Sequence, residues 1–312
     1  MTTTKQYLAL LLCLVVLGIS ACTTNKIESN EFIIEGEIKG LGNTILNVRM
    51  PGKTYDTPGY WSDSVVVTDD KFSFSGETDN IEYLRFFVKN EDIMKRTPGG
   101  YFPSTSNFIL LFIEPGAKIN VKGEITDFVD AYPSGTKAND ELAELHKEVY
   151  PILNESVNIM VKAVFTEDEG IKKQLFDSAS KIGEQATILK KDYIHKNTSS
   201  VVSAMYLSEI MVNGDMTDDK VIELFESLDN KLSSLPTYKE MESRIAGIIA
   251  TKEGNPFPSL VTSSTPSGDP FDLSSYKGKY VLVDFWGVWC GPCVAEMPQV
   301  KAFGEKYKDK LV

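Results

Sequence analysis

The hydrophobic pattern of the chain changes its period along the sequence, and this change limits the folds that the chain can adopt. From Phe32 onwards apolar and polar residues alternate in short runs, which are separated by Gly, Pro, Asp and Asn. Near Asn139 apolar residues begin to recur at three- and four-residue steps, and a continuous apolar run follows at 280–285. Alternation is typical of strands, and the longer period is typical of amphipathic helices. We therefore predict a multidomain chain with an N-terminal antiparallel β-sandwich or barrel, an α-helical middle and a C-terminal α/β part.

Two turns are predicted within the β-rich domain, which we place at 31–130. The pair Asp69–Asp70 lies between two alternating runs, predicts a hairpin and puts Phe72 and Phe74 on one face of a strand. The sequence "EPG" at 114–116 predicts a second hairpin. This region contains no convergent His, Cys or carboxylate cluster, so its aromatic residues are interpreted as core rather than as a ligand cage.

The region 138–252 is predicted to be helical. Asn139 is placed to cap the first helix, and Pro151 should kink or split it. Both histidines of the chain, His146 and His195, stand alone in charged neighbourhoods, and we interpret them as solvated surface residues. Further helices are predicted over about 169–196, 199–212, 218–233 and 237–251, with Thr217 as a cap.

The first residues of the chain have the pattern of a lipoprotein signal peptide. Lys5 precedes an uninterrupted apolar run over 7–19, which is too short to span a membrane. Small residues stand directly before Cys22, as in the bacterial lipobox, in which the peptidase cuts before a cysteine that then carries acyl chains. An ordinary secretory signal with an incidental Cys22 is the alternative. Because several acyl chains hold a protein firmly at a bilayer, the lipid bilayer is a predicted partner.

A location in the cell envelope, lipid-anchored and facing the periplasm, follows from this signal. Thr23 is not the acidic residue type associated with inner-membrane retention, which favours the outer membrane. The formal net charge of −12 argues against a nucleic-acid partner, because phosphate binding requires clustered Lys and Arg. The predicted boundaries are 1–21 for the signal peptide, 22–30 for a tether, 31–130 for the β-rich domain, 138–252 for the helical region and 254–312 for the C-terminal domain.

Cys290 and Cys293 are the two thiols expected in the mature protein, because Cys13 leaves with the signal peptide and Cys22 is lipidated. The pair follows the apolar run at 280–285 and precedes a helical stretch, so we predict that it lies at a helix N-terminus. Orphan backbone N–H groups and the helix dipole favour a thiolate there. Cys290 should therefore attack a substrate disulfide, and Cys293, one turn further on, should resolve the mixed disulfide.

Three other chemistries are available to a cysteine pair of this kind. A zinc site needs four ligands, and the chain offers no second pair to complete one. A structural disulfide would close so short a loop that its effect on the unfolded chain is minor. A peroxidatic cysteine usually has a Thr three residues before it, whereas Gly287 stands at that position. The pattern therefore favours a redox-active dithiol.

The segment "VLVDFWGVWCGPCVAEMP" resembles the active site of thioredoxin-like thiol-disulfide oxidoreductases, especially membrane-tethered TlpA/ResA-like proteins of the alkyl hydroperoxide reductase/thiol-specific antioxidant superfamily. The resemblance implies that Asp284 is a buried carboxylate, with a raised pKa, that carries protons to and from the second cysteine. The alternative for Asp284 is a residue at the end of the strand that is exposed to solvent. It also implies that Trp286 and Trp289 shield the thiols and that Pro298 kinks the helix. The dipeptide Gly291–Pro292 resembles that of reducing members.

The resemblance implies an envelope thiol-disulfide oxidoreductase, acting as a reductase or isomerase in cell redox homeostasis or cytochrome c maturation. Its partners would be protein dithiol or disulfide substrates and a membrane thiol-disulfide electron donor, and no cofactor or metal is expected. The alternative is a non-catalytic ligand- or partner-binding lipoprotein with a vestigial redox module.

The resemblance also gives expectations for the N-terminal domain and for the C-terminal domain. The region 31–130 resembles the domain of unknown function that precedes thioredoxin modules in exported lipoproteins, and it brings no known catalytic residues. The segment 254–312 is shorter than the roughly 100 residues that a thioredoxin fold needs. We therefore expect a partial thioredoxin-like fold, without the later strands and the cis-proline, that folds poorly alone.

Overall fold

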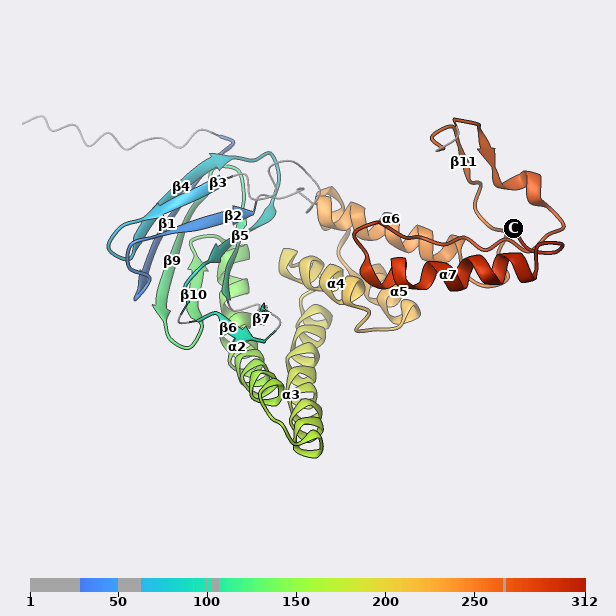
Figure 1. Cartoon of the computed structure of the whole chain (residues 1–312). Helices are drawn as coiled ribbons and strands as arrows, with labels where there is room; N and C mark the ends of the chain where they lie inside the picture. The colour runs from blue at the N-terminus through green and yellow to red at the C-terminus, as the bar shows by residue number, and fades with distance from the viewer. Residues whose placement is uncertain (1–28, 50–62, 92, 99, 103–106, 266–267) are drawn as a thin grey trace, which may run out of the picture. The chain divides into compact units, whose positions relative to one another are not determined.

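The computed structural model describes residues 29–49, 63–91, 93–98, 100–102, 107–265 and 268–312 (Figure 1). The predicted signal peptide, Cys22 and most of the predicted tether lie outside these residues. Within them, no helix combines the length and the apolar character needed to cross a membrane. The chain divides into an N-terminal unit up to Ser243 and a C-terminal unit from Arg244, and the division falls inside helix α6 (Pro236–Ala250).

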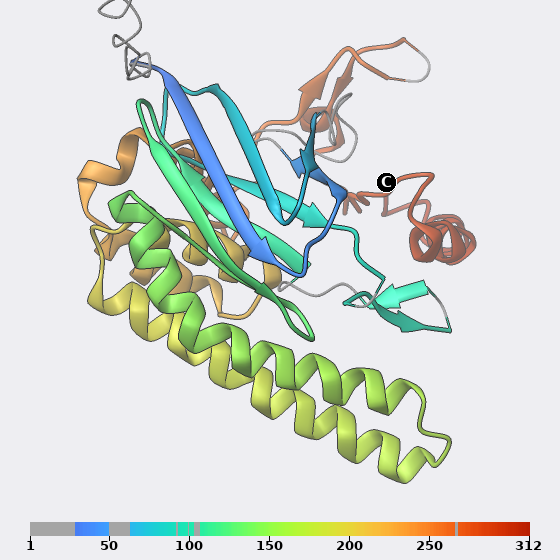
Figure 2. The ribbon, with the colours of Figure 1, turned by 90° about the vertical axis from the view of Figure 1, so that its left-hand side faces the viewer.

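Two four-stranded sheets make up the first part of the N-terminal unit (Figure 2). Their strand orders are β10-β9-β1-β4 and β3-β2-β5-β8, and β6 and β7 pair separately. The bounds are β1 Glu31–Lys39, β2 Thr44–Arg49, β3 Asp63–Val67, β4 Lys71–Glu77, β5 Glu82–Val88, β6 Lys95–Thr97, β7 Gly100–Phe102, β8 Phe108–Ile113, β9 Lys118–Ile125 and β10 Val129–Ser134.

The strand pairing departs from the predicted antiparallel arrangement at one place. β1 pairs with β4 in the antiparallel sense but with β9 in the parallel sense. The reason is a crossing between the sheets: β8 pairs with β5, whereas β9, the next strand along the chain, pairs with β1. The predicted hairpin at 114–116 is therefore wrong, because this turn carries the chain from one sheet to the other. Gly116 has a φ of 76° there, which suits glycine.

The inner faces of the two sheets share one hydrophobic core. In β1 alternate side chains are buried, as the period-two pattern predicts, and Phe32 is 0% exposed. Gly36 lies in the same row, where a Cβ atom would be 2.1 Å from the ring of Phe72. The Phe72 ring in turn meets Phe86 of the other sheet, with a centroid distance of 5.4 Å and an edge-on geometry. The missing side chain of Gly36 thus makes room for an aromatic contact that joins the sheets.

A turn forms at Asp69–Asp70, but the predicted hairpin is limited to one isolated bridge between Thr68 and Lys71. Both residues have positive φ angles, 48° and 67°, and backbone hydrogen bonds of 2.9 and 3.0 Å join Thr68 and Lys71 across the turn. Asp70 Oδ1 also accepts a hydrogen bond from the Gly42 amide at 2.6 Å. Beyond the turn β3 and β4 diverge into different sheets, and Phe72 and Phe74 face the core as predicted.

Helices complete the N-terminal unit. α2 (Lys137–Val164) and α3 (Glu169–Lys196) lie side by side (Figure 2). The bounds of α3 agree with the prediction. Pro151 does not split α2, which continues through it. The other helices are α4 Val201–Asn213, α5 Asp218–Ser227, the 3₁₀-helix η2 Asn230–Ser234 and α6, and Thr217 is the N-cap of α5 without a side-chain cap bond.

The start of α2 differs from the prediction. Thr136, not Asn139, is the N-cap, and its side chain accepts a hydrogen bond from the Asn139 amide. Asn139 lies in the first turn and is 0% exposed. Its side chain donates to the Phe112 carbonyl and accepts from the Phe112 amide, both at 2.8 Å. Asn139 therefore bonds α2 to strand β8 and does not cap the helix, because the Thr136 side chain already accepts a hydrogen bond from a free amide at the helix N-terminus.

The C-terminal unit contains α7 (Gly291–Lys306), the paired short strands β11 (Val261–Thr262) and β12 (Phe271–Asp272), and the 3₁₀-helix η3 (Leu273–Tyr276). The predicted strand over 280–285 is wrong for this structure, because 281–285 belong to no strand and Tyr280 makes only an isolated bridge. Tyr280 bridges Leu311 in the parallel sense, and the Leu282 amide donates to the Val312 carbonyl at 2.9 Å. These contacts join the segments before and after α7 by an isolated bridge and not by paired strands.

Candidate active site

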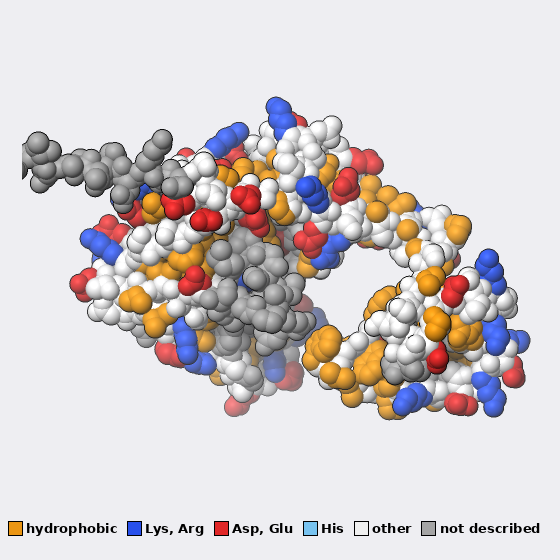
Figure 3. Space-filling view, turned by 90° about the horizontal axis from the view of Figure 1, so that it is seen from above, with side chains coloured by type: hydrophobic (Ala, Val, Ile, Leu, Met, Phe, Trp, Pro, Cys, Tyr) orange, Lys and Arg blue, Asp and Glu red, His pale blue; other side chains and the backbone are white. Residues whose placement is uncertain are grey.

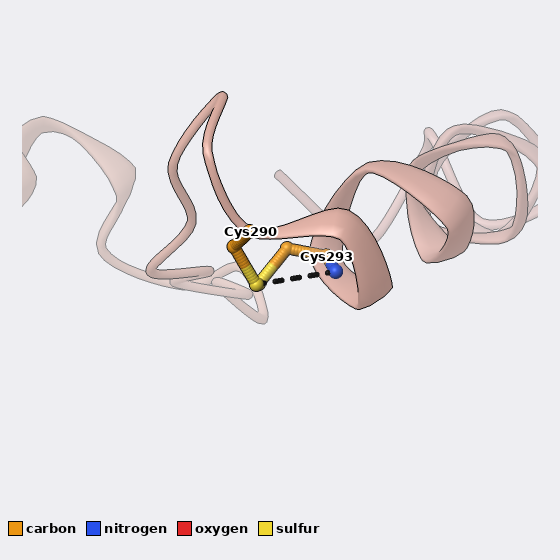
Figure 4. The surroundings of a disulfide bond; sticks show 2 residues. All are labelled: Cys290 and Cys293. Carbon is orange, nitrogen blue, oxygen red and sulfur yellow. Dashed lines mark hydrogen bonds between the residues drawn. A yellow bond between two sulfur atoms is a disulfide. The ribbon is translucent and has the colours of Figure 1, made fainter. Parts of the chain in front are cut away.

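Cys290 and Cys293 form a disulfide at the N-terminal end of α7, with a Cα–Cα distance of 5.3 Å (Figure 4). Cys290 is the N-cap residue, and its sulfur accepts a hydrogen bond from the Cys293 amide at 3.3 Å. Pro292 lies in the first turn, where an α-helix needs no backbone donor. The predicted position of the pair at a helix N-terminus is therefore confirmed, and the same local rules that start the helix place the first sulfur.

A tight turn positions Cys290. The Cys290 amide donates to the Gly287 carbonyl at 2.9 Å, and this bond closes the turn before the helix. Gly287 is buried, and a Cβ atom there would lie 2.6 Å from the ring of Trp289. The absence of a side chain at Gly287 thus lets the indole lie against the turn. Our sequence interpretation gave Gly287 no positive role, although a glycine between aromatic residues just before the motif was the available signal.

The predicted supporting residues surround this turn and helix. Trp286 is 52% exposed and Trp289 80% exposed, whereas both cysteines are half-buried. Pro298 lies inside α7, which continues beyond it to Lys306. The shielding role of the two tryptophans and the kink at Pro298 stay predictions.

Asp284 is exposed, so the prediction of a buried carboxylate is wrong for this structure. Residues 283–286 belong to no strand or helix, so among the described residues no regular element holds Asp284 in a buried position. Its predicted part in proton transfer stays a prediction.

Another group of titratable residues lies in the N-terminal unit. His146, predicted to be solvated, is 1% exposed, and its Nε2 is 2.5 Å from the Tyr206 hydroxyl. Burial lowers the pKa of His146 to about 3, and the charge of Lys190 acts in the same direction. The apolar spacing of α2 turns this side chain inward, which the charged neighbours in the sequence concealed. His195 is exposed, as predicted. The described residues hold no group of three or more His, Cys, Asp or Glu side chains that could bind a metal ion.

The segment that contains the two cysteines matches the model of a known protein family. Residues 252–312 match the model of the Redoxin family, and residues 32–142 match a domain of unknown function, DUF4369. The relatives include the thioredoxin-like protein YneN of Bacillus subtilis, which is 40% identical over 75 residues, or 24% of this chain and 40% of YneN.

Two proteins named thiol-disulfide oxidoreductase ResA are also similar. The protein of Bacillus subtilis is 43% identical over 75 residues, or 24% of this chain and 41% of its own length. The protein of Bacillus anthracis is 40% identical over 70 residues, or 21% of this chain and 40% of its own length. The chain thus spans about two fifths of the length of these curated relatives. No solved structure gives a significant match.

Proposed function

We propose that the chain is a thiol-disulfide oxidoreductase that exchanges disulfides with protein substrates through Cys290 and Cys293. The observation that carries the proposal is the disulfide at the N-cap of α7, with the Cys290 sulfur bonded to a helix amide. The match of this segment to the Redoxin family and its similarity to proteins named thiol-disulfide oxidoreductase support it.

The proposed exchange begins from the dithiol. The helix N-terminus stabilises the Cys290 thiolate, which attacks one sulfur of the substrate disulfide. A mixed disulfide forms, and the first substrate sulfur leaves as a thiolate that takes up a proton. The Cys293 thiol then loses its proton and attacks the Cys290 sulfur, which releases the second substrate sulfur. Two electrons have passed to the substrate, and the chain holds the disulfide that the structure shows. Asp284 is the proposed acceptor of the Cys293 proton.

The remaining parts of the proposal concern direction, partners and location. A Gly-Pro dipeptide between the cysteines favours reduction or isomerisation, including a part in redox homeostasis or cytochrome c maturation. The oxidised dithiol must then be reduced again, and a membrane thiol-disulfide carrier is the proposed electron donor. The lipobox-like residues before Cys22 support a lipid anchor and an envelope location facing the periplasm.

The test uses the full chain, a peptide with one disulfide as substrate and dithiothreitol as electron source. Cys290→Ser should reduce turnover to the uncatalysed rate, because the attacking sulfur is lost. Cys293→Ser should accumulate a mixed disulfide with the peptide, visible as an added mass that a reductant removes. Cys22→Ser is the matched control and should leave turnover unchanged, because this cysteine takes no part in the exchange. Wild-type turnover in Cys290→Ser would contradict the proposed function.

A further inference from the structure

A cavity of about 310 Å³ lies in the N-terminal unit between strand β5 and helix α4, apart from the cysteine pair. The side chains of β5 alternate, and Tyr83 and Arg85, on the face away from the sheet core, line the cavity. Its other walls come from α4: Met205, Ser208, Glu209, Val212 and Asn213. A volume of this size is at the lower end of the range for small-molecule sites.

Positively charged side chains outnumber negatively charged ones at this cavity. Arg85 is half-buried, stacks over the Tyr83 ring at 5.5 Å, and forms no ion pair with any described residue. Glu209 already accepts a hydrogen bond from Lys190 at 2.6 Å, and the Lys190 side chain is only 9% exposed. Two cations therefore face one carboxylate here. A half-buried guanidinium without a counterion is costly, and its donor geometry matches a carboxylate.

We propose that this cavity binds a small organic monocarboxylate. Arg85 pairs with the carboxylate. Ser208 and Asn213 offer further polar atoms, while Met205 and Val212 give an apolar wall for the body of the ligand. Glu209 in the same wall disfavours a dianion such as a phosphate ester, because it would repel the second charge.

The experiment is calorimetric titration of the full chain with sodium hexanoate, and with hexanamide as its neutral counterpart. Hexanoate should bind saturably, and hexanamide at least roughly tenfold more weakly, because it cannot pair with Arg85. Equal binding of the two compounds, or no saturable binding of hexanoate, would overturn the proposal. This comparison uses only the wild-type chain, so it does not depend on the folding of any variant.

Three variants sharpen the test. Arg85→Gln should weaken hexanoate binding roughly tenfold or more, whereas the matched Arg96→Gln, at an exposed arginine outside the cavity, should not change it. Cys290→Ser should bind hexanoate like the wild type, which separates this proposal from the redox function.

Discussion

The two units differ in how far their large apolar side chains are buried. In the N-terminal unit, two sheets enclose residues such as Phe32 and Phe86, which are 0% exposed. In the C-terminal unit, Phe285 is 88% exposed and Trp289 80%, and Gly287 is the one buried residue among those described from 251 to 312. Figure 3 shows hydrophobic side chains at the surface of this unit. A core requires a second layer of structure. The N-cap arrangement of Cys290 needs only its own helix, so it forms without such a core.

The strongest test of this contrast changes one phenylalanine in each unit. Phe86→Ala should lower the free energy of unfolding by about 3–5 kcal/mol, because it empties the space between the two sheets. Phe285→Ala, at an exposed position, should change it by no more than about 0.5 kcal/mol. Urea titration followed by far-ultraviolet circular dichroism measures both. Equal losses in the two variants would show that the C-terminal unit also has a packed core.

The pH dependence of stability should arise from a buried group of the N-terminal unit. The pKa of His146 is lowered to about 3, so the unfolded chain, with an ordinary pKa near 6.5, binds the proton more tightly. The stability that neutral His146 contributes is complete above pH 6.5 and is lost as the pH falls to about 3. This loss amounts to roughly 2–4 kcal/mol.

The variants His146→Gln and His195→Gln separate this effect from the titration of carboxylates. The first should flatten the fall in unfolding free energy between pH 6.5 and 3, whereas the second, at an exposed histidine, should retain it. The groups that face His146 are Lys190, Tyr150 and Tyr206. Identical pH profiles in the two variants would exclude His146 as the source.

A third comparison uses two asparagines that each bond to a backbone carbonyl. Asn139 is buried and bonds both backbone groups of Phe112, whereas Asn255 in the C-terminal unit is exposed and donates to the Ile249 carbonyl at 2.7 Å. Asn139→Ala should cost about 2–3 kcal/mol of unfolding free energy, because two buried backbone groups lose their partners. Asn255→Ala should cost less than about 1 kcal/mol, since water replaces the bond. Thermal unfolding of both variants distinguishes these outcomes.

The smallest expected losses of unfolding free energy are those of two glycine variants. Each of the two glycines faces an aromatic ring. Gly36→Ala would place a Cβ atom 2.1 Å from the buried Phe72 ring and should cost about 1–3 kcal/mol, because the packed core resists the shift. Gly287→Ala meets the Trp289 ring at 2.6 Å, but that ring is exposed and can move. Its expected cost is below about 0.5 kcal/mol. A large loss in Gly287→Ala would show that the turn before Cys290 is rigid.

Several features were predictable because their signals are local. Each of these features depends on residues within a few positions of one another. They are the alternation in β1, the turn at Asp69–Asp70, the bounds of α3 and the helix that starts at Cys290. Strand alternation, positive-φ turns and helix caps are properties of a short stretch of backbone. The two cysteines belong to this group, which is why their position at a helix N-terminus was predictable.

Other features depend on segments that are far apart in the chain. The parallel pairing of β1 with β9 and the bonds of Asn139 to Phe112 depend on which strands meet. The burial of His146 and the exposure of Asp284 depend on which layers cover them. Burial and strand partners arise only when distant parts of the chain come together, because apolar surface leaves water only against another surface. Residue order within a few positions thus decided the helix, the turn and the position of the two cysteines. The packing of remote segments decided the core, the cavity at Arg85 and the environment of every buried charge.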